Sequence, residues 1–259
     1  MSESERIVLK DKREQMLRLV TKGFYRELVR YGVDPDEVLT VANNLLGHIS
    51  IEPPAIASVR GTEAQLNLSL VEDRWEGEGR LSVLGVDLRP LDAYDVPQVA
   101  AWLRDPEAHA SFVPQFPTEL GALERYLMTP GRSYLAIMAG GNHVGIIGAD
   151  NVDSANAKLE MKKLIGEHNQ RGLGVGTRAT FAFLYYAFML LDAYKVYVHF
   201  HDINIRNLNL NKRLGFELEG LLLEDVQRPD GRVDLVRMCL LKPAWLHRFA
   251  AEMSVTERR

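Results

Sequence analysis

The sequence predicts a mixed α/β fold, in which helices flank a central sheet. Two pairs of strand-like segments are joined by short turns, as in antiparallel hairpins: Tyr134–Met138 with His143–Ala149, and Phe216–Asp225 with Arg232–Leu241. Between these pairs lies the apolar run Ala179–Leu191, which is too long for a strand and rich in Ala, Leu and Met. That composition predicts a buried helix.

The amino-terminal part of the chain predicts a helical hairpin. Apolar residues within Glu3–Tyr31 recur at three- and four-residue spacing, which indicates an amphipathic helix that could break at Gly23 and that ends at Gly32. Residues 34–37 (DPDE) predict a second helix start, with Asp34 as N-cap and Glu37 completing a capping box.

A linker with Pro53-Pro54 follows, and the alternating stretch Gln65–Val71 predicts a strand. The turn-rich Glu72–Arg80 separates that strand from Leu81–Leu88. We therefore predict an extension over residues 1–80 and a second domain over residues 81–259. The extension could be a lid, a homodimer face, a partner-binding module or structural padding.

Further elements complete the second domain: a helix Asp95–Arg104, a helix leading from Thr118 through Leu127, a strand Lys195–His201 and a short helix Asn204–Leu214. Asp95 is the expected N-cap of the first of these helices. A polar turn is expected over Asp150–Lys158, ahead of a strand Leu159–Ile165.

Composition excludes several function classes. With 259 residues, 46% of them hydrophobic, the chain can bury a substantial core. A net charge of −4 with both signs interspersed argues against nucleic-acid binding. The charge-dense opening predicts no secretory signal, and the longest apolar run is too short for a membrane span. The single cysteine, Cys239, excludes an internal disulfide and a multi-thiolate metal site. We expect a cytoplasmic protein without metal, membrane or nucleic-acid partners.

A glycine-rich turn, residues 171–177 (RGLGVGT), joins the strand Leu159–Ile165 to the buried helix. Glycines bring the backbone close to a ligand, and the first N–H groups of the helix have no partner within the helix. Those donors and the positive end of the helix dipole attract phosphate oxygens. The turn predicts a site for a phosphorylated cofactor, with a merely tight strand–helix turn as the alternative.

The form of the turn excludes a P-loop, because no Lys-Ser/Thr pair follows the last glycine, and its G-x-G-x-G spacing fits a dinucleotide fingerprint poorly. Arg171-x-x-Gly174-x-Gly176 matches the Arg/Gln-x-x-Gly-x-Gly/Ala signature of the GNAT superfamily of N-acetyltransferases. Residues 86–245 resemble the branch that contains ribosomal-protein, spermidine and amino-sugar acetyltransferases. Other matching motifs are Leu88-Arg89-Pro90-Leu91 with Asp105-Pro106-Glu107, Asn204–Phe216 (NIRNLNLNKRLGF), Glu219-Gly220, and Asp230-Gly231 with Asp234 and Met238.

The resemblance implies a mixed, mostly antiparallel central sheet flanked by helices, preceded here by the helical-hairpin extension. It also implies use of acetyl-CoA, with the diphosphate wrapped by the turn and pantetheine lying where the strand before the turn parts from its neighbour. The backbone N–H of Ile165 is a candidate to polarise the thioester carbonyl. The implied cofactor-binding residues are Leu164, Ile165, Arg171, Gly172, Leu173, Gly174, Val175, Gly176, Thr177, Asn204 and Asn207.

Amine acceptors with a pKa of about 10 arrive protonated, so the reaction needs a proton acceptor. Glu160, at the start of the central strand, is the first candidate, with a cross-strand pair to a Lys as the alternative. His199 and His201 share one face of the next strand and are further candidates, with structural roles as the alternative. The family's usual general acid is a Tyr, and Asn211 stands at that position; Asn can hydrogen-bond a sulfur but cannot supply a proton.

The predicted function is acetyl transfer from acetyl-CoA to a primary amine of a small molecule or sugar nucleotide. A small acceptor is favoured over a protein because the extension could enclose one side of the substrate cleft. Two alternatives stay open. The chain could acetylate a protein N-terminus or a lysine. It could also be a non-catalytic acyl-CoA-binding or scaffold protein, which Asn211 and the unexplained extension would suit.

Overall fold

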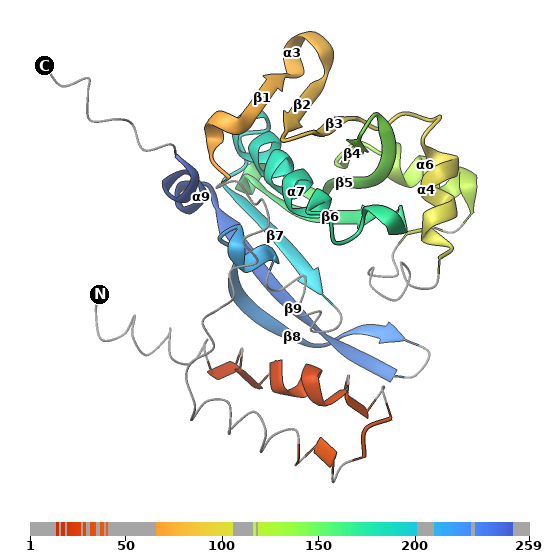
Figure 1. Cartoon of the computed structure of the whole chain (residues 1–259), viewed down its shortest axis with the longest axis vertical. Helices are drawn as coiled ribbons and strands as arrows, with labels where there is room; N and C mark the ends of the chain where they lie inside the picture. The colour runs from red at the N-terminus through yellow and green to blue at the C-terminus, as the bar shows by residue number, and fades with distance from the viewer. Residues whose placement is uncertain are drawn as a thin grey trace, which may run out of the picture. The chain divides into compact units, whose positions relative to one another are not determined.

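A computed structural model of the chain describes residues 66–105, 116–117, 119–200, 210–228 and 231–250, together with part of residues 14–40. The chain divides into two compact units (Figure 1). One comprises Met1–Gln65 with Ile203–Ile205, and the other comprises Leu66–Asp202 and Arg206–Arg259. The predicted boundary at residue 80 stays a prediction.

The described residues of the first unit include part of the helix expected there. Residues 20–26 are helical without interruption, so the predicted break at Gly23 is wrong. Gly32 has a positive φ of 78°, and its N–H donates to the carbonyl of Val29 at 2.9 Å, as at a helix C-terminus. The Asp34 N–H donates to Glu37 Oε2 at 2.9 Å, which confirms that half of the predicted capping box. The predicted linker at Pro53-Pro54 lies outside the described residues.

The second unit is built on a sheet whose described strands run in the order β1-β2-β3-β4-β5-β6-β7-β9-β8. Every neighbouring pair is antiparallel except β6 and β7, which are parallel, so the predicted mixed, mostly antiparallel sheet is confirmed. The strands are β1 (Val71–Arg74), β2 (Arg80–Val83), β3 (Val86–Pro90), β4 (Ser133–Ala139), β5 (Asn142–Asp153), β6 (Lys158–Ile165), β7 (Lys195–Phe200), β8 (Glu217–Arg228) and β9 (Gly231–Leu241).

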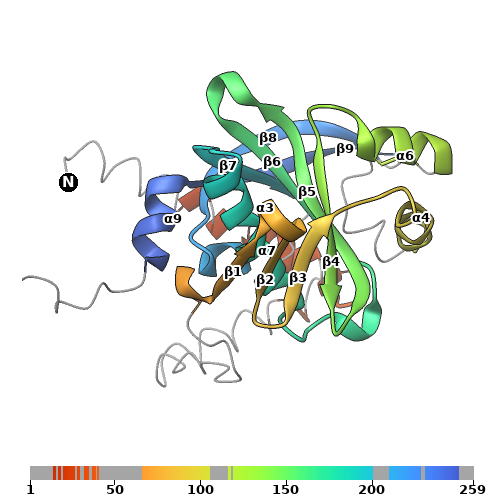
Figure 2. The same cartoon turned by 90° about the horizontal axis from the view of Figure 1, so that it is seen from above.

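Helices cover both faces of this sheet (Figure 2). The longer helices are α4 (Val96–Leu103), α6 (Leu120–Met128), α7 (Val175–Tyr185) and α9 (Lys242–Phe249). On one face α7 packs against β2, β3, β5 and β6. On the other, residues of α4 and α6 form a core cluster with β4, β5 and Leu164 of β6. No helix among the described residues is long and apolar enough to cross a membrane.

The predicted buried helix is confirmed, and it starts earlier than expected. α7 begins at Val175 and continues into a π-helical turn, η4 (Tyr186–Leu190). Its Phe181 ring lies 5.6 Å from that of Trp245 and 5.0 Å from that of Phe249, both on α9. α9 was not predicted. Burying an aromatic side chain contributes about 1.5–3 kcal/mol, so this cluster holds α7 and α9 together.

Two predictions near the start of the second unit are wrong. The stretch expected as a strand, Gln65–Val71, contains a 3₁₀ turn, η1 (Leu68–Leu70), because the Asn67 side chain accepts from the Ser69 N–H and caps it. The stretch expected as a turn, Glu72–Arg80, instead holds most of β1 and the short helix α3 (Trp75–Glu78). β1 pairs with β2 and so belongs to the sheet.

A polar turn expected over Asp150–Lys158 also differs. β5 continues to Asp153, and only the 3₁₀ turn η2 (Ser154–Asn156) separates it from β6. Asp150 therefore lies within a strand, directly opposite Glu160 of β6. Because paired residues on neighbouring strands present their side chains to the same face, this places two carboxylates side by side.

Candidate functional site

The glycine-rich turn follows β6 through a 3₁₀ turn, η3 (His168–Gln170). Gly172 has a φ of 82°, and Gly174, the N-cap of α7, has a φ of 76°. Both conformations favour glycine because a Cβ would be strained there. With glycine as N-cap, no side chain satisfies the first amides of α7.

The main-chain N–H groups of this turn point to an anion site. Thr177 and Arg178 make the first hydrogen bonds of α7, both to the Gly174 carbonyl at 3.1 Å. The N–H groups of Gly172, Leu173, Gly174, Val175 and Gly176 have no acceptor among the residues that the structure describes. Adjacent free donors at the positive end of a helix dipole form a binding site for phosphate oxygens.

The side chain of Arg171 binds the chain itself. Its Nε donates to the Ile165 carbonyl at 3.1 Å, and its Nη2 donates to the Gly166 carbonyl at 3.4 Å. The guanidinium also forms an ion pair with Asp105, just after α4, at 3.5 Å. Arg171 therefore connects the turn to the end of β6. Its own N–H donates to the His168 carbonyl at 3.1 Å, so the row of free amides begins at Gly172.

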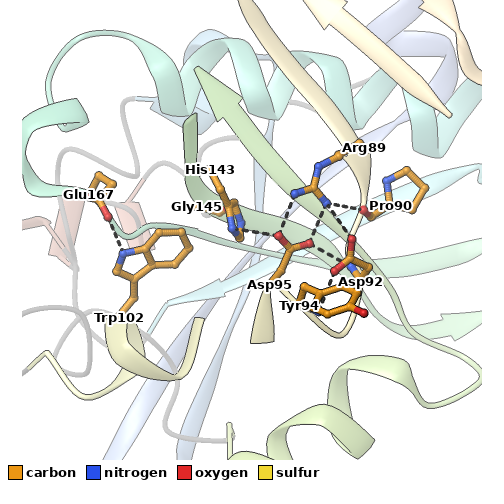
Figure 3. Close-up of polar contacts among 9 residues, drawn as sticks. All are labelled: Arg89, Pro90, Asp92, Tyr94, Asp95, Trp102, His143, Gly145 and Glu167. Atoms are coloured by element: carbon orange, nitrogen blue, oxygen red, sulfur yellow. Dashed lines mark hydrogen bonds and ion pairs between the residues drawn. The ribbon is translucent and has the colours of Figure 1, made fainter. Parts of the chain in front are cut away.

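Trp102 on α4 contacts the residues just after β6, at the start of the segment that leads to the glycine turn. A Cβ on Gly166 would lie only 2.0 Å from the Trp102 ring, so glycine is needed for the close approach. The indole Nε1 donates to Glu167 Oε1 at 3.0 Å (Figure 3). The residues from Gly166 to Arg171 thus rest on the end of α4.

A buried carboxylate holds α4 in place. Asp95, at the start of α4, accepts from Arg89 of β3 at 2.7 and 2.8 Å, and His143 of β5 lies 3.3 Å away (Figure 3). Burial opposes the charge of Asp95, but the hydrogen bonds from Arg89 and from the Asp92 N–H outweigh it and lower its pKa. Burial lowers the pKa of His143. Asp95 is the N-cap of α4 by position, but its side chain makes no capping hydrogen bond.

β6 and β7 pair along only part of their length. Their register covers Lys158 with Lys195, Leu159 with Val196, and Glu160 with Tyr197, and it stops there. Beyond this point β7 pairs only with β9 (Figure 1). From Met161 to Ile165, the edge of β6 that faces β7 therefore has no strand partner among the described residues. The Leu164 side chain turns away from α7 into the core cluster under α4 and α6.

Glu160 lies at the point where the two strands part. The side chain is buried, Asn151 Nδ2 donates to Oε2 at 2.7 Å, and His199 Nδ1 lies 3.1 Å from Oε1. Lys162, on the same strand, is 4.0 Å away. Burial opposes ionisation, but the contact with His199, the charge of Lys162 and the Asn151 bond together lower the pKa of Glu160. The principal partners are thus His199 and Asn151, not a cross-strand lysine.

A second buried carboxylate lies beside Glu160, and sequence reasoning missed it. Asp150 accepts hydrogen bonds from Tyr126, Tyr134 and Arg132 and forms an ion pair with Lys162 at 2.7 Å. Burial and the Asp150 charge raise the pKa of Tyr126 to about 12. Burial opposes the charge of Asp150 itself, but the Lys162 bond and the tyrosine donors lower its pKa.

Asn211 is buried, and its main-chain carbonyl accepts a hydrogen bond from the Phe216 N–H at 2.9 Å. His201, Asn204 and Asn207 lie outside the described residues. The site therefore has two described parts along β6: the amide-rich turn after Ile165 and the carboxylate cluster at Glu160. Five residues of strand separate them, or about 17 Å at about 3.3 Å per residue.

Comparison with known proteins identifies the family. A model of the acetyltransferase (GNAT) domain matches residues 86–217, which is about half of the chain. The chain belongs to this family. It is an N-acetyltransferase, as the glycine turn and its flanking motifs predicted.

Three individual relatives share only a fifth to about a quarter of their residues with this chain. The spermidine N(1)-acetyltransferase of Escherichia coli (strain K12) is 24% identical over 182 residues, covering 66% of this chain and 91% of that protein. The spermidine N-acetyltransferase of Vibrio cholerae, solved in complex with CoA and spermine, is 20% identical with a TM-score of 0.57, covering 62% of this chain and 98% of the other. A protein from T. thermophilus, described as an acetyltransferase, is 27% identical with a TM-score of 0.54, covering 65% of this chain and 92% of the other.

Proposed function

We propose that this protein transfers an acetyl group from acetyl-CoA directly to a primary amine of a small molecule. The turn between β6 and α7 would hold the diphosphate, the free edge of β6 the pantetheine arm, and the cluster at Glu160 the reacting groups. The observation that carries this proposal is the row of five main-chain N–H groups without an acceptor among the described residues, Gly172 to Gly176.

The turn fits a diphosphate in both charge and shape. Its donors are backbone groups that keep their positions without a side chain to reorganise, and Gly172 leaves its surroundings open for close approach. A Cβ on Gly172 would meet nothing within 4 Å. An anion bound there would satisfy amides that otherwise remain unpaired within the described chain.

The free edge of β6 fits an extended arm. An amide-containing chain such as pantetheine can hydrogen-bond to a strand edge as a neighbouring strand would. Lying along Ile165 to Met161, it would lead from the turn toward the place where β6 and β7 join. Bound acetyl-CoA would supply the activated acetyl thioester there. Of the cofactor-binding residues that the family resemblance implies, only Asn204 and Asn207 lie outside the described part of the chain.

The charges near Glu160 bear on how many amino groups the acceptor carries. Both relatives whose names state a substrate act on spermidine, a polyamine that calls for unpaired negative charge. Here Asp150 is paired with Lys162 and Arg132, and Glu160 with His199. This balance favours an acceptor with a single amine, such as an amino-sugar nucleotide, over a polyamine.

Substitution of Gly174 tests the cofactor site. Gly174→Glu would place bulk and negative charge among the donors, so we expect no measurable CoA binding by isothermal titration calorimetry. Gly85→Glu is the matched control, because Gly85 has a similar φ of 78°, has nothing within 4 Å of its Cβ position and lies in the β2–β3 turn. Equal CoA affinity in both variants would refute the placement.

Thiol release from acetyl-CoA identifies the acceptor class. We expect turnover with amino-sugar nucleotides or other small monoamines, and slower turnover with spermidine, because no described carboxylate near Glu160 is unpaired. Turnover only with peptide amines would instead support a protein acetyltransferase. Preferred turnover of spermidine would contradict the charge argument while leaving the cofactor site intact.

A further inference from the structure

We propose that His199 accepts the proton of the acceptor ammonium and that Glu160 is the positioning residue that orients the His199 ring. This inference rests on the proposed acetyl transfer and assigns the proton-transfer step within that same site.

The Glu160 carboxylate determines which His199 nitrogen carries a proton. Its Oε1 lies 3.1 Å from His199 Nδ1, while Asn151 holds Oε2 at 2.7 Å. An ionised carboxylate only accepts hydrogen bonds, so the proton of a neutral His199 ring is on Nδ1. The lone pair of the ring is then on Nε2, which is the nitrogen free to take a proton.

The Nε2 atom of His199 makes no hydrogen bond to any residue that the structure describes. It is buried, although the His199 side chain as a whole is 15% exposed. Buried polar atoms are nearly always hydrogen-bonded, so an unpaired one requires an explanation. The N–H of an acceptor ammonium is a donor of the kind this atom needs.

His199 also lies where a reacting amine is required. The last β7 residue that pairs with β6 is Tyr197, and residues two apart on a strand share a face. The Tyr197 and His199 rings are 5.4 Å apart, which confirms that they do. His199 therefore reaches Glu160 across the opening between the strands, at the end of the free β6 edge.

Nearby cations are neutralised by other carboxylates. Lys162 of β6 lies 2.7 Å from Asp150 of β5, and Arg237, opposite His199 on β9, lies 3.0 Å from Glu219 of β8. An imidazolium at His199 would thus meet the Glu160 charge directly.

Glu160 is the poorer proton acceptor of the pair. Although burial opposes its ionisation, its partners His199, Lys162 and Asn151 lower its pKa, and a carboxylate that holds its charge so readily is a weak base. General-base catalysis is most effective when the pKa of the base is near the working pH, and histidine is the residue type that titrates there.

In the proposed step, one ammonium proton moves to His199 Nε2 and then to solvent. The neutral amine forms the new C–N bond as the C–S bond of the thioester breaks. The second amine proton ends on the departing sulfur, which leaves as the CoA thiol. Glu160 stays ionised and stabilises the imidazolium form of His199.

Nitrogen-15 NMR of the full-length protein with CoA bound tests the ring orientation independently of turnover. We expect the neutral His199 ring to carry its proton on Nδ1, with the signals assigned by their loss in His199→Asn. A ring protonated on Nε2 would overturn the proposal. The outcome is read from the unmutated protein, and His199→Asn serves only to assign the signals.

The pH dependence of kcat/KM for the amine separates the two residues. His199→Asn keeps a donor toward Glu160 but loses Nε2, so we expect at least a ~100-fold lower kcat/KM, loss of the acid limb and unchanged CoA affinity. Glu160→Gln should keep the acid limb, because His199 Nε2 is still present. His247→Asn, at an exposed position on α9, is the matched control.

The opposite pattern would overturn the proposal. If Glu160→Gln removes the acid limb and His199→Asn keeps it, Glu160 is the base. Loss of CoA binding and amine turnover in the unmutated protein would instead refute the proposed function, so the two failures are distinguishable.

Discussion

Lys162 and Asp150 carry opposite charges inside the protein, where neither is well hydrated. Their side chains are 6% and 4% exposed, and their charged atoms lie 2.7 Å apart. Removing an ion from water costs several kcal/mol, and only an intact pair with further hydrogen bonds offsets that cost. Tyr126, Tyr134 and Arg132 supply those further bonds to Asp150.

Lys162→Met should therefore be strongly destabilising. Removing one partner leaves the Asp150 charge buried, so we expect the free energy of unfolding to fall by about 3–5 kcal/mol in urea titrations followed by circular dichroism. Lys158→Met is the control on the same strand, because the Lys158–Asp153 pair is 3.4 Å long and about a third exposed; its loss should cost at most about 1 kcal/mol. Equal losses in the two variants would show that the buried pair contributes nothing special.

At the scale of elements, α4 connects β3 to the glycine turn. Its start is held by the Arg89–Asp95 pair, and its end contacts the turn through the Trp102–Glu167 bond and the Asp105–Arg171 pair. The position of the turn amides therefore depends on α4 as well as on β6 and α7.

Gly166→Ala tests this dependence. The added methyl group would overlap the Trp102 ring, so we expect a loss of stability of about 1–3 kcal/mol and a weaker affinity for CoA. Gly220→Ala adds the same methyl group where nothing lies within 4 Å and should change neither quantity. A Gly166→Ala protein with unchanged CoA affinity would show that α4 does not position the turn.

Elements with strong local signals could be predicted from the sequence. The β4–β5 and β8–β9 hairpins and α7 follow from alternation, turn residues and a long apolar run, which act within a few residues. The error at η1 has a local cause as well, because the side chain of Asn67 competes with strand pairing at an otherwise alternating segment.

The carboxylate cluster could not be predicted, because its members come together only through tertiary packing. Asp150 lies on β5, Lys162 on β6, Tyr126 on α6 and Tyr134 on β4, with no spacing in the sequence that joins them. Glu160 and His199 were each named as candidate bases. Their contact depends on the register of two parallel strands, which no local pattern reveals.

At the scale of the whole sheet, the one parallel pair among the described strands is where the sheet opens. β7 follows β6 through the crossover helix α7, starts beside it, and is then held by β9 alone. The same crossover places the first turn of α7 at the far end of the opening. A single β-α-β connection thus supplies both the donors for an anion and the free strand edge that leads to Glu160.

Amide chemical shifts of isotope-labelled protein, recorded during titration with CoA, test this account most directly. Main-chain N–H groups that donate hydrogen bonds to a diphosphate must change their chemical shifts strongly. We predict the largest saturable changes at Gly172 to Gly176, and smaller ones from Met161 to Ile165. Saturable CoA binding that leaves the amides of Gly172 to Gly176 unchanged would contradict the central claim.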